Sequence, residues 1–396
     1  MTTLQTATGV FGGLLILGAL LSGLAHRGTL SLAAVFVLAG FLLGDGATGL
    51  IHLKPDSGFV ADLTTVALIV ILFRDGLDVD AQLIQREWRV PLRKLVIGMP
   101  ITAAIVAVVT HIFIGLTWAQ SFLLGALLSP TDPVLSSGVV TDARVPRIVR
   151  HSLNLESGLN DGLALAAVLA LAAAVDTRSH HFVWWHFALQ DVGLGFAFGI
   201  VCGLVASIVM PPATARRIPT VQKTLYGLGI AFATYSATVL PPRGNGLIGV
   251  FVAAIVLGAR RPDLRDHFVE GAGEVIEIVK LGVFTVFASL LTVDGLTTGG
   301  WAAVAVVVAT LLVARPAAIW AALAGTGLDP AAKGFMAWFG PKGVATMAFA
   351  LLILGRGLPG GQQIFDIAAL TVVASVVLHG LTETRGIAWL RERSSR

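Results

Sequence analysis

Charged residues are scarce in this sequence, and this scarcity excludes a soluble globular protein. Only 13% of the 396 residues are Asp, Glu, Lys or Arg, and 56% are hydrophobic. Soluble proteins carry about a quarter of their residues as charged ones. The mean hydropathy of +0.85 leaves too little polar surface to keep a 41.2 kDa chain in water. The sequence therefore predicts an integral membrane protein.

Other absences exclude further classes. The single cysteine, Cys202, excludes an intramolecular disulfide framework. No His-Glu-x-x-His or Gly-x-Ser-x-Gly motif occurs, so we expect neither an enzyme nor a bound cofactor. The net charge is +4, but the basic residues do not gather on one soluble segment, and nucleic acid is not an expected partner. Residues 1–10 lack Lys and Arg, unlike the basic start of a cleaved signal peptide.

Apolar runs long enough to cross a bilayer recur along the whole chain. A transmembrane helix needs roughly 20 apolar residues, and continuous apolar runs favour helices over the alternating strands of a barrel. The sequence predicts an all-α polytopic membrane protein with about 13 transmembrane helices in one domain, residues 1–396. Spans 1 to 13 are expected near residues 8–25, 30–45, 59–76, 91–114, 118–140, 151–175, 189–210, 221–240, 245–259, 269–291, 300–324, 334–355 and 364–386.

Basic residues are distributed unevenly between alternate connections. With the N-terminus outside, the cytoplasmic segments hold 20 Lys and Arg, including Arg74 and Lys94. The outer connections hold four, namely Lys54, Arg178, Arg243 and Arg356. This asymmetry follows the positive-inside rule. We therefore expect a multi-pass protein of the cell membrane, with its N-terminus outside and its C-terminus in the cytoplasm.

Five charged residues nevertheless lie well inside predicted spans 5, 6, 11 and 12. An unpaired charge at mid-bilayer costs roughly 2.5–3.5 kcal/mol, so five would cost roughly 12–17 kcal/mol, comparable with the stability of a whole domain. They must pair, lose their charge or line water, which predicts a functional polar site. The five are Asp132, Glu156, Asp161, Arg315 and Lys342.

Span 5 is interrupted in its middle by two prolines. Pro130 and Pro133 flank Thr131 and Asp132, and each proline removes a helical hydrogen bond. The segment is expected to be unwound, with free backbone carbonyls. Such breaks are tolerated in a membrane only where protein or a watery cavity satisfies them.

Span 12 is interrupted as well. Gly340, Pro341 and Gly343 surround Lys342 in its middle. Because the two interrupted spans are seven apart in order, they cross the membrane in opposite directions. Opposed broken helices are typical of inverted-repeat transporters, and the repeats are expected to be spans 4–6 and 11–13.

Span 6 carries a polar stripe on an apolar helix. Its members share neighbouring helical rows and comprise Asn154, Glu156, Ser157, Asn160 and Asp161. Gly158 and Gly162 allow another helix to pack closely. Arg315, deep in span 11, needs a carboxylate partner, and we expect it to pair with Glu156. In span 10, the i, i+3 spacing of Glu277 and Lys280 predicts a structural ion pair or a subunit contact.

Together these motifs resemble those of NhaP-type monovalent cation:proton antiporters, the bacterial and archaeal relatives of animal sodium/proton exchangers. The resemblance rests on SPTDPV at 129–134, ESGLNDG at 156–162, an Arg-bearing span 11 and GPKGV at 340–344. It implies a homodimer in the lipid bilayer that exchanges monovalent cations and protons. Its mobile core would comprise spans 4–6 and 11–13 (about 91–175 and 300–386), and its dimerisation scaffold spans 1–3 and 7–10 (about 8–76 and 189–291).

The resemblance also implies roles for individual residues. Asp161 would bind the proton and the cation in turn. Asp132, Ser157 and the carbonyl of Thr131 would help hold the cation, and Asn160 would orient the site. Glu156 and Arg315 would form a structural ion pair.

Two positions depart from the family pattern. Arg74 stands where many members carry an acidic residue, with Asp75 beside it as a possible accessory carboxylate in a segment expected to form a cytoplasmic helix end. Lys342 stands where Arg is usual; it keeps the charge that compensates the broken helix but loses the bidentate fork.

One shared carboxylate suffices for exchange. Burial favours the protonated form of a carboxylate and a nearby cation favours the ionised form, so the two ions compete. If only occupied sites cross the membrane, exchange follows without ATP. With Asn160 beside Asp161, we expect electroneutral exchange of one cation for one proton, although Asp132 could titrate as well. Oxygen ligands fit sodium, our first expectation, and also lithium or potassium.

Two alternatives belong to other classes of transport protein. A proton- or sodium-coupled symporter for a small solute needs a roomier, aromatic-lined cavity than spans 5 and 6 offer. A cation channel usually builds its filter from a symmetric ring of subunits, which two opposed broken helices do not resemble. An intramembrane hydrolase is a more distant alternative.

Overall fold

The fold is all-helical throughout the part of the chain that the structure describes. This computed structural model describes residues 8, 9, 11–13, 15, 16, 32–79, 88–132, 139, 142, 144–176, 184–211, 217–241 and 243–394, and no strand occurs among them. The helical segments, three of them π-helical (η), are α2 (Leu32–Leu43), α3 (Gly58–Asp78), α5 (Arg89–Arg93), η1 (Lys94–Gly98), α6 (Met99–Ile114), α7 (Trp118–Leu128), α9 (Arg147–Val175), α10 (Trp184–His186), η3 (Phe187–Gly193), α11 (Leu194–Val209), α13 (Thr220–Val239), α14 (Gly246–Arg260), α15 (Pro262–Gly271), α16 (Gly273–Ser289), α17 (Val293–Thr298), α18 (Gly300–Val308), η4 (Ala309–Ala314), α19 (Arg315–Ala322), α20 (Pro330–Trp338), α21 (Val344–Gly355) and α22 (Gly361–Ser394).

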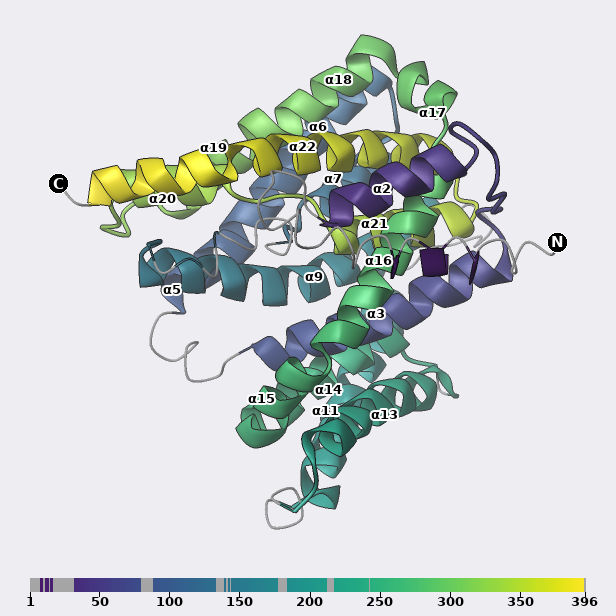
Figure 1. Ribbon diagram of the computed structural model, residues 1–396, viewed down its shortest axis with the longest axis vertical. Coiled ribbons are helices and arrows are strands. Elements are labelled where there is room, and N and C mark those ends of the chain that lie inside the picture. The colour runs from purple at the N-terminus through teal and green to yellow at the C-terminus, as the bar shows by residue number, and fades with distance from the viewer. Residues whose placement is uncertain are drawn as a thin grey trace.

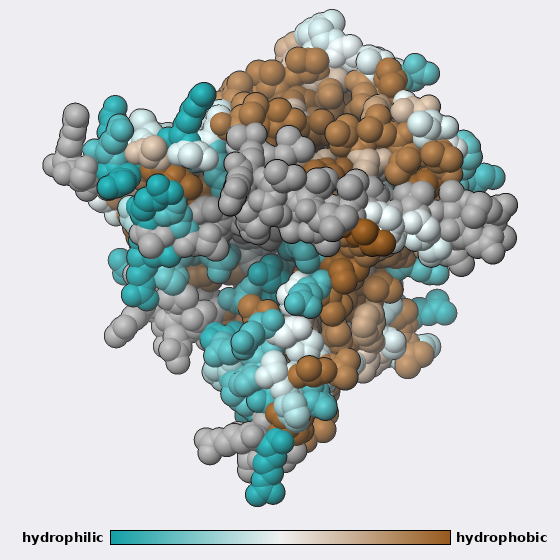
Figure 2. Space-filling model, viewed as in Figure 1, coloured by the Kyte–Doolittle hydropathy of each residue, from teal (hydrophilic) through white to brown (hydrophobic). Residues whose placement is uncertain are grey.

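The prediction of an all-α membrane protein is confirmed. Among the described residues, five continuous helices are long and apolar enough to cross a bilayer: Arg89–Ile114, Arg147–Val175, Trp184–Val209, Gly300–Ala322 and Gly361–Arg393. Large apolar side chains are exposed on the outside, such as Trp301 at 72% and Ile208 at 69%. Figure 2 shows such residues covering much of the face around α18, with hydrophilic residues near the C-terminal end of α22. The count of 13 spans stays a prediction.

The helices form two groups along the long axis of the molecule (Figure 1). α11, α13, α14 and α15 lie at one end, and α6, α18, α19, α20 and α22 lie toward the other. Between them, α3 packs against α14, α9 and α21, while α16 packs against α2, α3 and α21. This arrangement places α3 and α16 next to the broken segments.

Several boundaries differ from the predicted spans. Predicted span 10 begins at residue 269, but α15 ends at Gly271 and α16 begins only at Gly273, with Ala272 buried between them. Glycine on both sides of one residue lets the chain turn where the hydropathy pattern shows a continuous run. α22 is longer than predicted span 13, because it continues past the apolar run to Ser394.

Both predicted breaks are present where the structure describes them. α7 begins with a capping box between Thr117 and Gln120 and ends at Leu128, before Pro130. Thr131 and Asp132 are not helical, and Pro133 lies outside the described residues. Span 12 is divided into α20 and α21, with residues 339–343 not helical between them.

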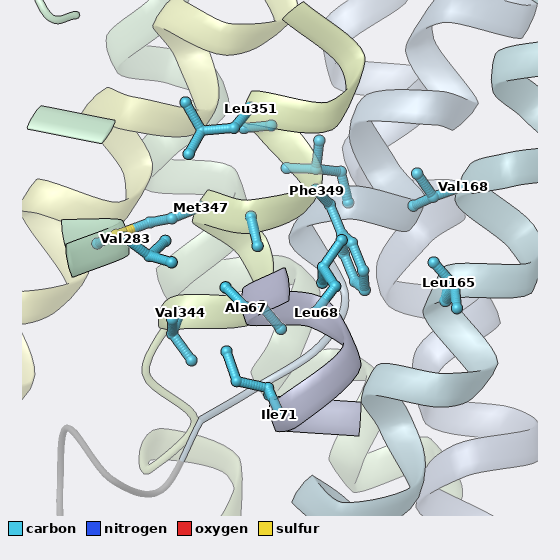
Figure 3. Close-up of a cluster of buried hydrophobic side chains, with 14 of the residues drawn as sticks. Ala67, Leu68, Ile71, Leu165, Val168, Val283, Val344, Met347, Phe349 and Leu351 are labelled. Atoms are coloured by element: carbon cyan, nitrogen blue, oxygen red, sulfur yellow. The ribbon is translucent and has the colours of Figure 1, made fainter. Parts of the chain in front are cut away.

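A buried apolar cluster joins four helices beside these breaks (Figure 3). Its side chains come from α3, α9, α16 and α21, and all are buried. The labelled members are Ala67, Leu68, Ile71, Leu165, Val168, Val283, Val344, Met347, Phe349 and Leu351. The cluster fixes the four helices against one another next to the polar residues.

Candidate functional site

The two interrupted segments meet directly. The backbone N–H of Asp132, in the break that follows α7, donates a hydrogen bond to the carbonyl of Pro341 at 2.9 Å. This bond joins residues more than two hundred positions apart and satisfies two backbone groups that the breaks set free. The breaks of spans 5 and 12 therefore form one structural unit.

Each break also supplies a charge to the helix end of the other. The carboxylate of Asp132 accepts the N–H of Val344, the first residue of α21, at 3.1 Å. The ammonium of Lys342 donates to the carbonyls of Pro130 at 3.1 Å and Ser129 at 3.4 Å, just past the end of α7. A carboxylate stabilises a helix N-terminus and a cation stabilises a C-terminus. Both charged residues are buried.

Glycine is required at two positions of the span 12 break. A Cβ atom on Gly343 would collide with the side chain of Asp132, and one on Gly340 would collide with the guanidinium of Arg315. These glycines therefore allow two charged side chains to approach the backbone.

Asp161 lies on the buried face of α9 with an oxygen that has no partner. Its side chain is 4% exposed, and among the described residues nothing donates to its Oδ1. The neighbouring Asn160 donates from Nδ2 to the carbonyl and the hydroxyl of Thr131, both at 3.1 Å, while its Oδ1 also lacks a described partner. Unsatisfied buried oxygens are costly unless a ligand or water completes them. The structure thus brings Asp161, Asn160 and Thr131 together, with two acceptors unfilled.

Asp75 lies in the last turn of α3, at a helix end as the sequence predicts, but it is buried beside the site; that this end is cytoplasmic stays a prediction. Asp75 is 7% exposed, and its carboxyl lies close to that of Asp161. Close packing explains the contact, since a Cβ on Gly158 of α9 would lie 3.2 Å from the Asp75 carbonyl. Beside it, Arg74 lies 3.6 Å from Asp75 and 3.3 Å from Asp78.

Two members of the predicted polar stripe are less enclosed than Asp161. Ser157 is half-buried, and Asn154 is exposed and so lies away from the site. Within the described residues, no group of three His, Cys, Asp or Glu side chains is arranged to hold a metal ion. A monovalent cation would therefore need hydroxyl or carbonyl oxygens in addition to the carboxylates, and the oxygens of Thr131, Ser157 and Asn160 are of that kind.

Glu156 pairs with Arg315, as the sequence predicts, and with a second cation that it does not. Arg315 Nη1 lies 2.9 Å from Glu156 Oε1, and Arg315 also donates to the carbonyls of Met336 at 3.3 Å and Phe339 at 3.2 Å. Lys94, expected in a cytoplasmic segment, is instead fully buried and forms an ion pair with the other oxygen of Glu156. The reason is the π-helical turn η1, which begins at Lys94 and faces α19 and α9. These residues form a buried triad of two cations and one carboxylate.

A row of polar residues on α22 also holds the span 12 break and has no counterpart in the sequence prediction. Ser375 Oγ accepts the N–H of Lys342 at 2.9 Å. His379 Nε2 lies 3.0 Å from the carbonyl of Trp338, the last residue of α20, and its Nδ1 lies 3.1 Å from Ser375 Oγ. Thr382 Oγ1 accepts the indole N–H of Trp338 at 3.0 Å. The spacing of three to four residues is the only sequence signal for this row.

Glu277 and Lys280, both described, do not form the predicted ion pair, because no nitrogen–oxygen distance between their side chains is 4.0 Å or less. Lys280 is 4% exposed, because its side chain lies on the buried face of α16, whereas Glu277 is half-buried. The i, i+3 spacing of two opposite charges is therefore not enough to predict an ion pair here.

Comparisons with known proteins show the family to which the chain is similar. The family described as "Sodium/hydrogen exchanger, transmembrane" matches residues 14–387. The K(+)/H(+) antiporter NhaP2 of Shewanella baltica is 25% identical over 372 residues, which are 92% of this chain and 63% of the relative. The K(+)/H(+) antiporter NhaP of Alkalimonas amylolytica is 24% identical over 396 residues, covering 96% of this chain and 66% of the relative. This chain thus spans about two thirds of the length of these relatives or slightly less.

A solved structure shares the fold. The sodium proton antiporter MjNhaP1 from Methanocaldococcus jannaschii superposes with a TM-score of 0.84 at 19% identity, covering 98% of this chain and 100% of that one. With the family match extending over most of the residues, the chain belongs to the family of transmembrane sodium/hydrogen exchangers.

Proposed function

We propose that this protein is a secondary active antiporter that exchanges a monovalent cation for a proton across the cell membrane. The observation that carries the proposal is the buried carboxylate of Asp161, one oxygen of which has no partner among the described residues and which lies beside two broken helices that contact each other. A group that is buried, ionisable and incompletely bonded can hold either a proton or a cation, but not both at full affinity. The names of the related antiporters support the same activity.

In this proposal Asp161 is the shared site, and the oxygens of Asp132, Ser157 and Thr131 complete the cation shell. Asn160 fixes Thr131 by donating one hydrogen bond to its carbonyl and one to its hydroxyl. Glu156 with Arg315, and Lys342 at the end of α7, hold the helices that present these groups. Asp75 is an accessory carboxylate through its contact with Asp161.

The exchange is one cation for one proton, and the protein works as a homodimer through the helices of spans 1–3 and 7–10. The core of spans 4–6 and 11–13 carries the site between the two faces by alternating access. The N-terminus is outside and the C-terminus is cytoplasmic, in keeping with the basic residues of the cytoplasmic segments. Sodium suits oxygen ligands, and the relatives named for potassium make that ion the first competitor.

The test uses purified protein in proteoliposomes that hold a pH gradient with the voltage clamped. Sodium, lithium and potassium chloride are added separately to the wild type and to Asp161→Asn. We expect cation-dependent collapse of the gradient in the wild type and its loss in the variant. Asp294→Asn, which changes an exposed carboxylate on α17, is the matched control and should exchange normally.

Competition for one carboxylate has a further signature. On the acid side of the activity profile, the apparent KM for the cation should rise about tenfold for each pH unit, as mass action requires. A KM that does not change with pH would contradict a shared site. Flux of a solute with the cation, instead of exchange for protons, would favour the symporter, and flux that runs down a cation gradient without moving protons would favour a channel.

A further inference from the structure

A buried lysine on α16 has no part in any of the roles above. Lys280 lies on α16, outside the two broken segments, with 4% of its surface exposed. Among the described residues it forms no ion pair within 4.0 Å and no hydrogen bond with its ammonium group. A lysine is rarely buried without a compensating charge. Its presence therefore calls for an explanation from its surroundings.

The packing of four helices places this lysine at the level of the carboxylates. On α3, Asp75 follows Ile71 by four residues. On α9, Asp161 precedes Leu165 by four residues, and on α16, Lys280 precedes Val283 by three. Each step is about one helical turn. Those three apolar residues belong to the cluster in Figure 3. In that view Leu68 lies above Ile71 and Val168 above Leu165, so the chain descends along α3 and rises along α9. By helix rise alone, the sequence then places Asp75 and Asp161 one turn beyond Ile71 and Leu165 on the same side of the cluster.

The direction of α16 brings Lys280 to that same side. Near its beginning, α3 shares a pocket with the later part of α16, through Leu63 and Val286. Near its end, α3 meets the preceding helix α15, where Phe73 and Phe268 lie edge to face at 5.3 Å. The two helices, α3 and α16, are therefore antiparallel. Moving from Val283 back to Lys280 along α16 runs in the same direction as moving from Ile71 on to Asp75 along α3. Lys280 acts electrostatically on both Asp75 and Asp161 from this position.

Charged side chains gather around the end of α3. The end of α3 carries Arg74, Asp75 and Asp78, which together have one excess negative charge. Arg74 is closer to Asp78 (3.3 Å) than to Asp75 (3.6 Å), and it is also near the half-buried Glu277. Arg265, which also acts on Asp78, is paired with Asp266 at 2.7 Å. Lys280 is a buried cation on α16, a helix that packs against α3.

We propose that Lys280 is the resident counter-charge of Asp75, which leaves Asp161 as the only carboxylate that exchanges a proton for a cation. This inference rests on the proposed antiport. It explains how a site with an extra carboxylate can still exchange one ion for one. Without the lysine, Asp75 would attract a second proton or strengthen the binding of the cation.

The experiment compares Lys280→Met, Lys280→Arg and the double variant Asp75→Asn/Lys280→Met in the proteoliposome assay. One charge within about 10 Å, at an effective dielectric of about 20, changes affinity about tenfold. Lys280→Met should therefore lower the KM for the cation about tenfold and make exchange depend on voltage. Lys280→Arg should resemble the wild type. The double variant should restore both the KM and the independence of voltage, because it removes both charges.

Two further measurements separate the possible failures. Lys223→Met, at another buried lysine, on α13, should leave the KM unchanged. Stabilisation against heat by each cation, measured in detergent, reports binding without transport, and Lys280→Met should show it at lower concentrations. If Asp75→Asn/Lys280→Met keeps the lowered KM and the voltage dependence of Lys280→Met, Lys280 is not the counter-charge of Asp75. If the wild type shows no cation-dependent exchange, the antiport itself is refuted instead.

Discussion

Glu156→Gln should destabilise the protein more than the loss of either cation that contacts Glu156. The carboxylate serves two cations, Arg315 at 2.9 Å and the fully buried Lys94. At 2.9 Å and an effective dielectric of about 20, one such pair has a Coulomb energy of about 6 kcal/mol, and breaking a buried pair costs about 3–5 kcal/mol net. The glutamine leaves both cations uncompensated, so we expect a loss at the upper end of that range.

Removing one cation has a smaller effect because the triad has one positive charge in excess. Lys94→Met leaves the two-pronged pair of Arg315 with Glu156 intact, and should cost less than half as much as Glu156→Gln. Arg315→Met leaves Lys94 with Glu156 but also frees the carbonyls of Met336 and Phe339, so it should fall between the two.

Thermal unfolding in detergent, followed by tryptophan fluorescence, measures this order. Glu274→Gln changes an exposed carboxylate on α16 and should shift stability by no more than about 0.5 kcal/mol. If Lys94→Met were as destabilising as Glu156→Gln, the excess-charge reasoning would be refuted, and Lys94 would be required for packing instead.

Three further predictions concern the span 12 break. Gly343→Ala should reduce exchange at least about tenfold, because its Cβ would displace a carboxylate of the site, whereas Gly273→Ala meets nothing within 4 Å and should be neutral in the same flux assay. Lys342→Met should abolish exchange and lower the unfolding temperature, while Lys342→Arg should keep part of the exchange activity and part of the thermal stability. Equal loss in the two variants would mean that charge is not what the helix end requires. Ser375→Ala and His379→Gln should each lower the maximal exchange rate several-fold with little change in thermal stability. Each removes a hydrogen bond of about 1 kcal/mol that α22 makes with the break. Unchanged rates would refute a positioning role for α22.

The breaks and one ion pair could be predicted because their causes are local or leave few choices. Pro130 removes a helical hydrogen bond, and Gly340, Pro341 and Gly343 together disfavour a continuous helix in the middle of an apolar run. Glu156 and Arg315 are charged residues in the middle of apolar runs, so each needed a partner and few were possible. Sequence reasoning works well where a rule of covalent geometry or of burial applies to the residue itself.

The remaining site residues depend on tertiary packing, which the apolar pattern does not determine. Lys94 lies near the start of its span, where a lysine is normally expected to reach the interface. A π-helical turn and the neighbouring α9 enclose it instead. Asp75 likewise follows a long apolar run and resembles a helix end, but Gly158 admits the α3 backbone so closely that Asp75 reaches Asp161. For Lys280 the sequence predicts an ion pair on its own helix or a subunit contact, and the first is wrong because the side chain lies on the face of α16 that other helices cover.

The contacts of the two broken segments predict that swapping Asp132 and Lys342 between them will destabilise the protein. Asp132 and Lys342 do not act as partners of each other: the carboxylate binds the N-terminus of α21, and the ammonium binds the carbonyls after α7. In the double variant Asp132→Lys/Lys342→Asp, net charge is conserved, yet an ammonium would face N–H groups and a carboxylate would face carbonyl oxygens. Both interactions with the helix dipoles would become repulsive, so the double variant should be less stable than either single variant. Thermal unfolding and exchange measured on the three variants test this. Recovery of exchange in the double variant would show that the two residues act as an ion pair, and it would contradict the assignment of each charge to the helix end of the other break.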